Sequence, residues 1–118
     1  MTLPDDLRDD LALSVLGDTA RMLPLEVYRS EAVLAVEYRS VLGPAWHCVG
    51  RSADIAAEGD HLVADIPVCH HDGSAGTMSV LVTRGHDGAI RAFHNACTHR
   101  GAPLATACGN VARFTCPY

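Results

Sequence analysis

The sequence predicts a mostly β protein, a small antiparallel domain that follows a helical N-terminal arm. From Ala45 onward, short runs rich in β-branched and aromatic residues alternate with Gly, Asp, His and Pro, which is typical of short strands joined by turns. Before that point, apolar residues recur at helical spacing. We therefore expect a helical arm over residues 1–44 and a β domain over residues 45–118, since 118 residues suffice for only one small domain.

Two helices are expected in the arm. Leucine and valine side chains recur every four residues and stop before Gly17, which predicts a short amphipathic helix over residues 5–16. After the break at Pro24, Ser30 can cap a second helix, and Glu31 suits its first turn. Gly43 and the proline after it end this second helix.

The strands are predicted from runs of β-type residues between turn signals. The segment Gly85–Gly88 has the composition of a hairpin turn between two of them. Trp46 and Cys48 are expected to pack in the core of the domain. The expected strands are Trp46–Val49, His61–Ile66, Thr77–Thr83, Ala89–His94 and Val111–Thr115.

Charge and hydropathy exclude several kinds of partner. The net charge of −5 provides no basic surface for phosphate backbones or anionic lipid, so neither nucleic acid nor a membrane is expected as a partner. The first residues lack a basic segment followed by an apolar run, and no stretch of about 18 apolar residues occurs anywhere. We expect a cytoplasmic protein whose five cysteines are thiols or metal ligands rather than disulfides.

The residues that indicate chemistry are Cys97, His99 and Cys116, which fall in two predicted loops. A cysteine and a histidine that are separated by a single residue on a turn can each reach a different iron of a two-iron cluster. A second loop with cysteine and histidine would complete a site with two thiolates on one iron and two imidazoles on the other. Imidazole is neutral where thiolate is negative, so this ligand set makes an added electron easier to accept.

These motifs resemble the Rieske [2Fe-2S] proteins, in which Cys-x-His is followed after 15 to 20 residues by Cys-x-x-His. Here sixteen residues separate His99 from Cys116, and the last histidine of the pattern would be residue 119, beyond Tyr118. The extra disulfide of the respiratory branch would require cysteines at Ala102 and Tyr118, so the resemblance favours the oxygenase and ferredoxin branches. The motif CTHRGAPL, the ending FTCPY and the lead-in over residues 22–50 are similar to the α subunits of Rieske non-haem iron oxygenases.

The resemblance implies an N-terminal fragment of a longer protein, truncated inside the second cluster motif. In that family the cluster receives electrons from a ferredoxin or a flavin-dependent reductase. It passes them to a mononuclear Fe(II) in a C-terminal domain, where O2-dependent hydroxylation or demethylation occurs, and the full-length proteins are homo-oligomers. We expect no catalytic residue in this chain and no oxygenase activity from it alone. A free-standing Rieske ferredoxin-type electron carrier is the alternative, and a zinc-stabilised binding module is a third possibility.

The remaining cysteines and histidines lie outside this pattern, and we expect structural or surface roles for them. The segment Cys69–His71 is interpreted as a solvated loop, and Cys108 as a residue before a turn at Gly109–Asn110. Surface positions are expected for His61, His86 and His94. Arg100 either hydrogen-bonds near the cluster or forms a surface ion pair.

Overall fold

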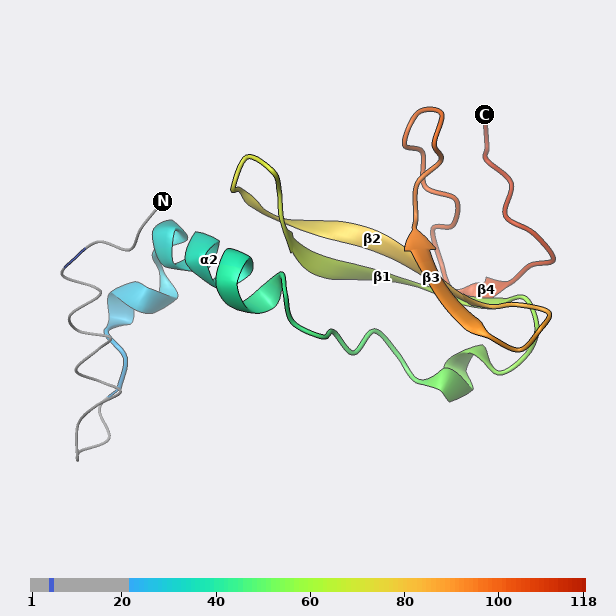
Figure 1. The fold of residues 1–118 in the computed structure, drawn as a ribbon, viewed down its shortest axis with the longest axis horizontal. Coiled ribbons are helices and arrows are strands. Elements are labelled where there is room, and N and C mark those ends of the chain that lie inside the picture. Colours follow the sequence, from blue (N-terminus) through green and yellow to red (C-terminus); the bar gives the residue numbers. More distant parts are fainter. Residues whose placement is uncertain (1–4, 6–21) are drawn as a thin grey trace. The chain divides into compact units, whose positions relative to one another are not determined.

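The computed structural model describes Asp5 and residues 22–118 (Figure 1). The chain divides into two compact units, one comprising residues 1–45 and 67–76 and the other residues 46–66 and 77–118. The helix expected over residues 5–16 lies, apart from Asp5, outside the described residues. The expected domain boundary near residue 44 stays a prediction.

The first unit contains the second expected helix, which begins where the sequence predicts. A 3-10 helix, η1 (Leu25–Tyr28), precedes α2 (Glu31–Glu37), which continues into a π-helical turn, η2 (Tyr38–Leu42). The Ser30 hydroxyl caps α2 by accepting a hydrogen bond from the Val33 N–H at 3.4 Å. None of the helices among the described residues has the length and apolar character needed to cross a bilayer.

The strands after residue 59 form a four-stranded sheet with the order β3-β2-β1-β4 (Figure 1). Its strands are β1 (Asp60–Cys69), β2 (Ala75–Arg84), β3 (Ile90–His94) and β4 (Gly109–Asn110), and a 3-10 helix, η3 (Ser52–Ile55), precedes them. In the antiparallel pair β2–β3, Val80 lies opposite His94 and Arg84 opposite Ile90. The predicted antiparallel β fold and the strands expected at 61–66, 77–83 and 89–94 are therefore confirmed.

Two predicted strands are wrong. Trp46–Val49 forms no strand, Trp46 is fully exposed at 103% and Cys48 is exposed rather than packed in the core. Val111–Thr115 is also irregular, and the strand β4 occupies Gly109–Asn110, where a turn was expected. A strand persists only where a neighbouring strand completes its hydrogen bonds, and local β propensity cannot supply that neighbour.

The β4 position is explained by tertiary hydrogen bonds from one side chain. The Asn110 amide nitrogen donates to the Glu58 carbonyl and to the Asp60 carboxylate, both at 2.8 Å. These bonds and the pairing of Asp60 with Asn110 hold the segment in the sheet. Because these long-range hydrogen bonds satisfy the Asn110 amide, they replace the local turn that the neighbouring sequence favours.

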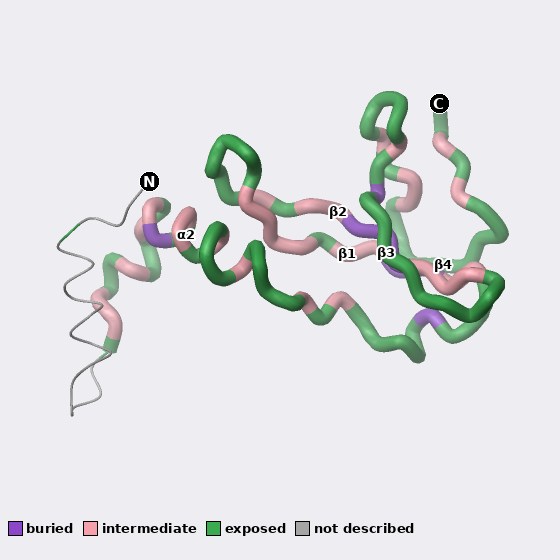
Figure 2. Tube along the Cα trace, viewed as in Figure 1, coloured by how far each residue is buried: buried purple, intermediate pink, exposed green. Residues whose placement is uncertain are grey.

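The core of the second unit lies on one face of the sheet. Ile55 from η3 packs with Leu62, Val80 and Val82, and all four are buried. Figure 2 shows the buried stretch of β2 in purple. Val80 and Val82 point to this face because side chains alternate along a strand, whereas Leu81, 2% exposed, points to the other face. This buried hydrophobic cluster fixes β2, from which the hairpin to β3 extends.

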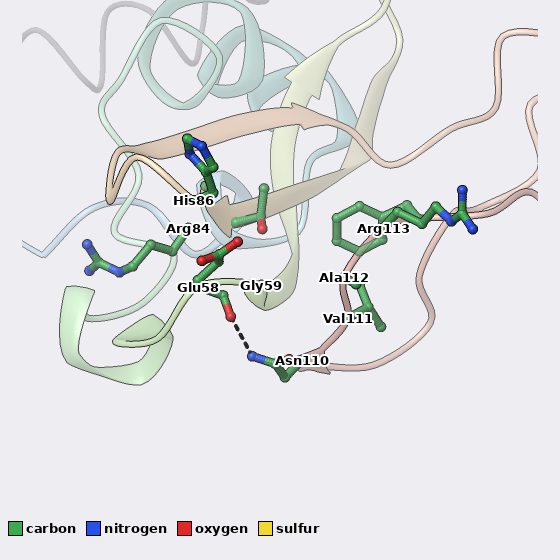
Figure 3. Close-up of a pocket in the computed structure, with 11 residues that line it drawn as sticks. Glu58, Gly59, Arg84, His86, Asn110, Val111, Ala112 and Arg113 are labelled. Atoms are coloured by element: carbon green, nitrogen blue, oxygen red, sulfur yellow. Dashed lines mark hydrogen bonds between the residues drawn. The ribbon is translucent and has the colours of Figure 1, made fainter.

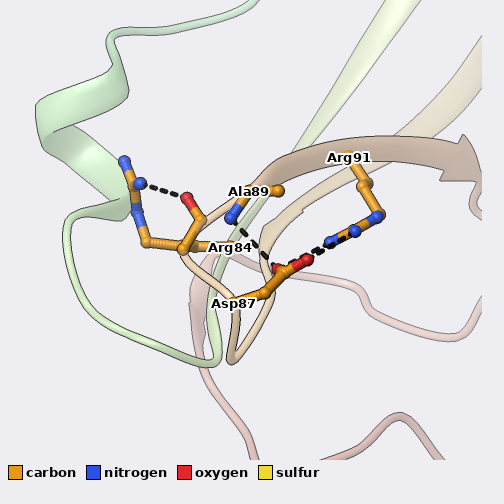
Figure 4. A network of polar contacts seen from close by, with 5 residues as sticks. Arg84, Asp87, Ala89 and Arg91 are labelled. Carbon is orange, nitrogen blue, oxygen red and sulfur yellow. Dashed lines mark hydrogen bonds and ion pairs between the residues drawn. The ribbon is translucent and has the colours of Figure 1, made fainter.

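The β2–β3 hairpin closes at the turn that the sequence predicts. The Gly85 N–H donates to the Ala89 carbonyl at 2.9 Å, and the Arg84 guanidinium donates to the Gly88 carbonyl at 2.8 Å. The Asp87 carboxylate pairs with Arg91 at 2.7 Å and accepts from the Ala89 N–H at 3.1 Å (Figure 4). The hydrogen bonds from Arg91, then from Ala89, hold the pKa of the Asp87 carboxyl well below its usual range.

Candidate metal centre

Cys97 lies in a tight turn shortly after the end of β3. The Cys97 N–H donates to the Ala102 carbonyl, and the Gly101 N–H donates to the Cys97 carbonyl, both at 2.8 Å. Gly101 closes the turn with φ +71°, in the left-handed region where an L side chain is disfavoured. The turn therefore presents the Cys97 side chain from a backbone that two hydrogen bonds hold closed.

The neighbours of the Cys97 sulfur favour its thiolate form. Hydrogen bonding from the His99 backbone, then from the Cys116 thiol and the Arg100 backbone, lowers the pKa of the Cys97 thiol, while partial burial acts in the opposite direction. The thiolate is the form of cysteine that binds a metal, so the turn favours the ligand form.

The structure brings two of the three predicted ligands together and leaves the third on the same turn. Cys97 and Cys116 are half-buried neighbours, although eighteen residues separate them in sequence, whereas the His99 side chain is exposed. Among the described residues, no three His, Cys, Asp or Glu side chains are placed to hold a single metal ion. A two-iron site has a different requirement, because two thiolates share one iron and the imidazoles bind the other. The two thiols match the sulfur half of that donor set, and His99 is the one imidazole among the three predicted ligands.

Two buried polar residues lie close to the loops of the predicted ligands, and their burial is not evident from the sequence. The expectation that His61 is a surface residue is wrong, since its side chain is 6% exposed and packs edge-on against the Phe114 ring. Asn95 is 4% exposed and hydrogen-bonds across the loop that contains Cys97. The only sequence signals were the position of His61 at the start of a strand and of Asn95 two residues before a cysteine. Neither position predicts burial.

The other cysteines and histidines lie apart from this turn. The expected solvated loop is wrong for Cys69, which ends β1 and is half-buried, because its backbone continues the strand. It is confirmed for His70 and His71, which are exposed in the β1–β2 connection. His86 and His94 are exposed, as predicted. All five cysteines are free, and Cys48 and Cys108 are exposed.

A surface pocket of about 430 Å³ lies beside β4, and no predicted ligand lines it. Figure 3 shows His86 and Arg84 on one side and Arg113 on the other, with the hydrogen bond between Glu58 and Asn110 nearby. The Arg84 guanidinium is already engaged by the carbonyls of Ser52 and Gly88. This pocket is therefore separate from the three predicted ligands.

Comparison with known proteins places the chain in a class. The family model of the Rieske [2Fe-2S] domain matches residues 45–118, which is more than half of the chain. The chain therefore belongs to the Rieske [2Fe-2S] domain family, and a Rieske domain implies an iron-sulfur cluster.

The curated proteins to which the chain is similar include oxygenase subunits. The chain is 39% identical over 114 residues to the glycine betaine monooxygenase oxygenase subunit of Chromohalobacter salexigens, covering 96% of this chain and 23% of that protein. It is 30% identical over 102 residues to the carnitine monooxygenase oxygenase subunit of Acinetobacter baumannii, covering 86% of this chain and 25% of that protein. The chain thus spans about a quarter of the length of these curated relatives.

Solved structures agree with this placement. An inhibitor complex of a quaternary ammonium Rieske monooxygenase matches with a TM-score of 0.74 at 28% identity, covering 100% of this chain and 29% of that chain. Naphthalene 1,2-dioxygenase from Rhodococcus sp. matches with a TM-score of 0.77 at 28% identity, covering 97% and 23%. This chain is therefore similar to the Rieske domains of oxygenase subunits, and these relatives include both monooxygenases and dioxygenases.

Proposed function

We propose that this chain is an electron-transfer domain in which Cys97, His99 and Cys116 bind a [2Fe-2S] cluster. The observation that carries the proposal is the match of the Rieske [2Fe-2S] family to residues 45–118, which include all three side chains. The Cys116 thiol, from a separate loop, also lowers the pKa of the Cys97 thiol. When bound, the cluster supplies a site that stores and releases one electron. The position of His99 on the same turn as Cys97 supports its assignment to the second iron.

The residues of the turn favour the reduced, more negative state of such a site. The backbone N–H groups of His99 and Arg100 lower the pKa of the Cys97 thiol, and donors to a ligating sulfur stabilise added negative charge. Because Gly101 and its hydrogen bonds hold the turn closed, these donors are in place before an electron arrives. Such preorganisation reduces the rearrangement that electron transfer requires.

Anaerobic reconstitution with iron and sulfide tests the assignment. We expect visible absorption and matching iron and sulfide contents in the chain, and a loss of both in Cys97→Ser and Cys116→Ser. The exposed cysteines provide matched controls, so Cys48→Ser and Cys108→Ser should bind as the unmodified chain does. Iron binding that survives both Cys97→Ser and Cys116→Ser would contradict the assignment.

Alkylation followed by mass spectrometry provides an independent readout. Bound iron and sulfide should protect Cys97 and Cys116 from iodoacetamide, because a metal-bound sulfur is no longer a free nucleophile. Cys48 and Cys108 should react at the same rate with and without iron and sulfide. Equal protection of all four cysteines would indicate aggregation or general metal binding and would overturn the assignment.

We further propose that the longer protein is an oxygenase subunit that acts on a quaternary ammonium or N-methylated compound. The relatives that support this are the glycine betaine and carnitine monooxygenase subunits and an N,N-dimethyl phenylurea N-demethylase subunit. In this proposal, residues 1–44 form an arm and residues 45–118 the cluster domain. A ferredoxin or flavin-dependent reductase supplies electrons, a C-terminal domain holds a mononuclear Fe(II), and the subunits form a homo-oligomer.

The gene downstream of codon 118 tests this second proposal directly. We expect some hundreds of further codons that include two histidines and one carboxylate as iron ligands, and turnover of glycine betaine or carnitine by the full-length protein. An early stop codon would instead favour the free-standing electron carrier. The similarity to the glycine betaine monooxygenase oxygenase subunit extends to residues before Ala45, and this supports the oxygenase.

A further inference from the structure

Two polar residues are buried in the described part of the chain, and both contact the loops that carry the predicted ligands. They are His61 and Asn95, at 6% and 4% exposure, whereas the other buried residues are hydrophobic. No buried side-chain nitrogen or oxygen among the described residues lacks a hydrogen-bond partner. Burying a polar group costs free energy unless its hydrogen bonds are replaced, so both side chains need the loops in their present position.

Asn95 joins the start of the Cys97 loop to its end. Its side-chain nitrogen donates to the Ser79 hydroxyl at 3.2 Å and to the Ala105 carbonyl at 2.7 Å. Its side-chain oxygen accepts from the N–H groups of Leu104 and Ala105, both at 3.0 Å. The Asn95 backbone N–H also donates to the Ser79 carbonyl at 3.0 Å. One amide thus closes the loop between residues 95 and 105 and fastens it to β2.

His61 holds the segment between the two ligand loops. Its Nε2 lies 3.1 Å from the Ala107 carbonyl, and its Nδ1 lies 3.5 Å from the Gly59 carbonyl. The shorter contact places the donating proton on Nε2. The ring of Phe114, two residues before Cys116, packs edge-on against the imidazole with centroids 5.0 Å apart. His61 therefore contacts the chain just after the first loop and just before the second cysteine.

We propose that Asn95 and His61 are positioning residues that together set the Cys97 and Cys116 sulfurs at the spacing the metal centre needs. Asn95 fixes the loop that contains Cys97, and His61 fixes the approach to Cys116. The role in the metal centre rests on the proposed function, whereas the hold of Asn95 and His61 on the two loops can be tested in the chain without metal. Neither side chain contacts a predicted ligand directly, so each acts through the backbone it holds.

Amide hydrogen exchange on the full chain without metal tests the structural part. In Asn95→Ala, the Leu104 and Ala105 amides lose their acceptor, and we expect their exchange to accelerate at least about tenfold, while the amides of β2 change little. Ser79→Ala removes one of the four hydrogen bonds of the Asn95 side chain and should accelerate exchange at the same two amides by about threefold. This variant replaces Asn95→Ala in the test if Asn95→Ala does not fold. Exchange at Leu104 and Ala105 that stays at the unmodified rate in the folded variant would overturn the role of Asn95.

Cobalt(II) binding to the full chain tests the positioning part, because a thiolate pair gives a cobalt complex with a charge-transfer absorption. We expect Asn95→Ala to weaken cobalt affinity by about tenfold. Leu81→Ala, which destabilises the opposite face of the sheet, should leave cobalt affinity unchanged under conditions where the chain stays folded. Equal weakening in Leu81→Ala would show a loss of general stability and overturn positioning.

Two His61 variants separate its hydrogen bond from its packing. His61→Phe keeps a ring against Phe114 but cannot donate to Ala107, and we expect cobalt affinity to fall by about fivefold. His61→Gln retains a donor at a similar reach and should recover part of that affinity. Equal losses in the two variants, or no loss in either, would overturn the positioning role of His61.

The failure of the proposed function gives a different result. If Cys97→Ser binds cobalt as tightly as the unmodified chain, the ligand assignment fails. The hydrogen-exchange result tests the structural role of Asn95 independently of the ligand assignment.

Discussion

A methyl group added at Gly101 is expected to weaken the metal centre while leaving the rest of the domain intact. Gly101 has φ +71°, and nothing lies within 4 Å of a Cβ built on it. The whole effect of Gly101→Ala therefore comes from the backbone conformation. Gly88, in the β2–β3 hairpin, has φ +77° and equally open surroundings, so Gly88→Ala is a matched control.

The magnitude follows from the conformational preference of alanine. An L-residue in the left-handed region costs about 1–2 kcal/mol. The restriction that alanine imposes on the unfolded chain offsets about 0.4–1 kcal/mol of this cost. The net loss is about 1 kcal/mol, which corresponds to about a fivefold change in an equilibrium constant. We expect both variants to lower the melting temperature by about 4 °C.

Iron and sulfide content after anaerobic reconstitution distinguishes the two variants. Gly101→Ala opens the turn that presents Cys97, so its apparent iron affinity should fall by about fivefold, whereas Gly88→Ala should bind iron as the unmodified chain does. Circular dichroism during heating measures the common loss of stability. The reasoning is refuted if both variants lose iron equally, or if Gly101→Ala loses stability but no iron.

Three further predictions concern the opposite face of the sheet, the β1–β4 contact and the fourth ligand. Leu81→Ala should reduce the free energy of unfolding by about 2–5 kcal/mol in urea titration, because Leu81 is 2% exposed, and a loss below about 1 kcal/mol would contradict its burial on that face. The Asn110 amide, then the Ala57 N–H, lower the pKa of Asp60 below its usual value of 3.8. The stability from this contact is therefore present above about pH 4 and is lost as the pH falls through the lowered pKa. In Asn110→Ala, the free energy of unfolding should depend less on pH in this range. An unchanged pH dependence would count against the contact. One histidine added after Tyr118 supplies the last position of the Rieske pattern and should raise iron and sulfide retention, and no gain would count against the ligand assignment.

Local signals in the sequence were enough to predict the elements whose structure depends on near neighbours. Ser30 caps α2 as expected, because its hydroxyl needs only the N–H of Val33 three residues away. The Gly85–Gly88 turn closes the β2–β3 hairpin for the same reason, since its hydrogen bonds lie within five residues. The family assignment also followed from sequence, because the spacing of Cys97, His99 and Cys116 and their flanking residues are local facts.

The tertiary structure decided what depends on residues that are distant in sequence. Trp46 lies in a segment with β-type composition but has no strand beside it, so it is exposed. His61 is buried because Ala107, 46 residues away, supplies an acceptor, and Phe114 covers its ring. The meeting of Cys97 with Cys116 and the closing of the first loop by Asn95 depend in the same way on how the loops lie on the sheet. The sequence by itself determined the family and the residues that are predicted to bind iron. The fold determined how the two loops that contain Cys97 and Cys116 lie, because only packing and long-range hydrogen bonds fix the distance between two loops.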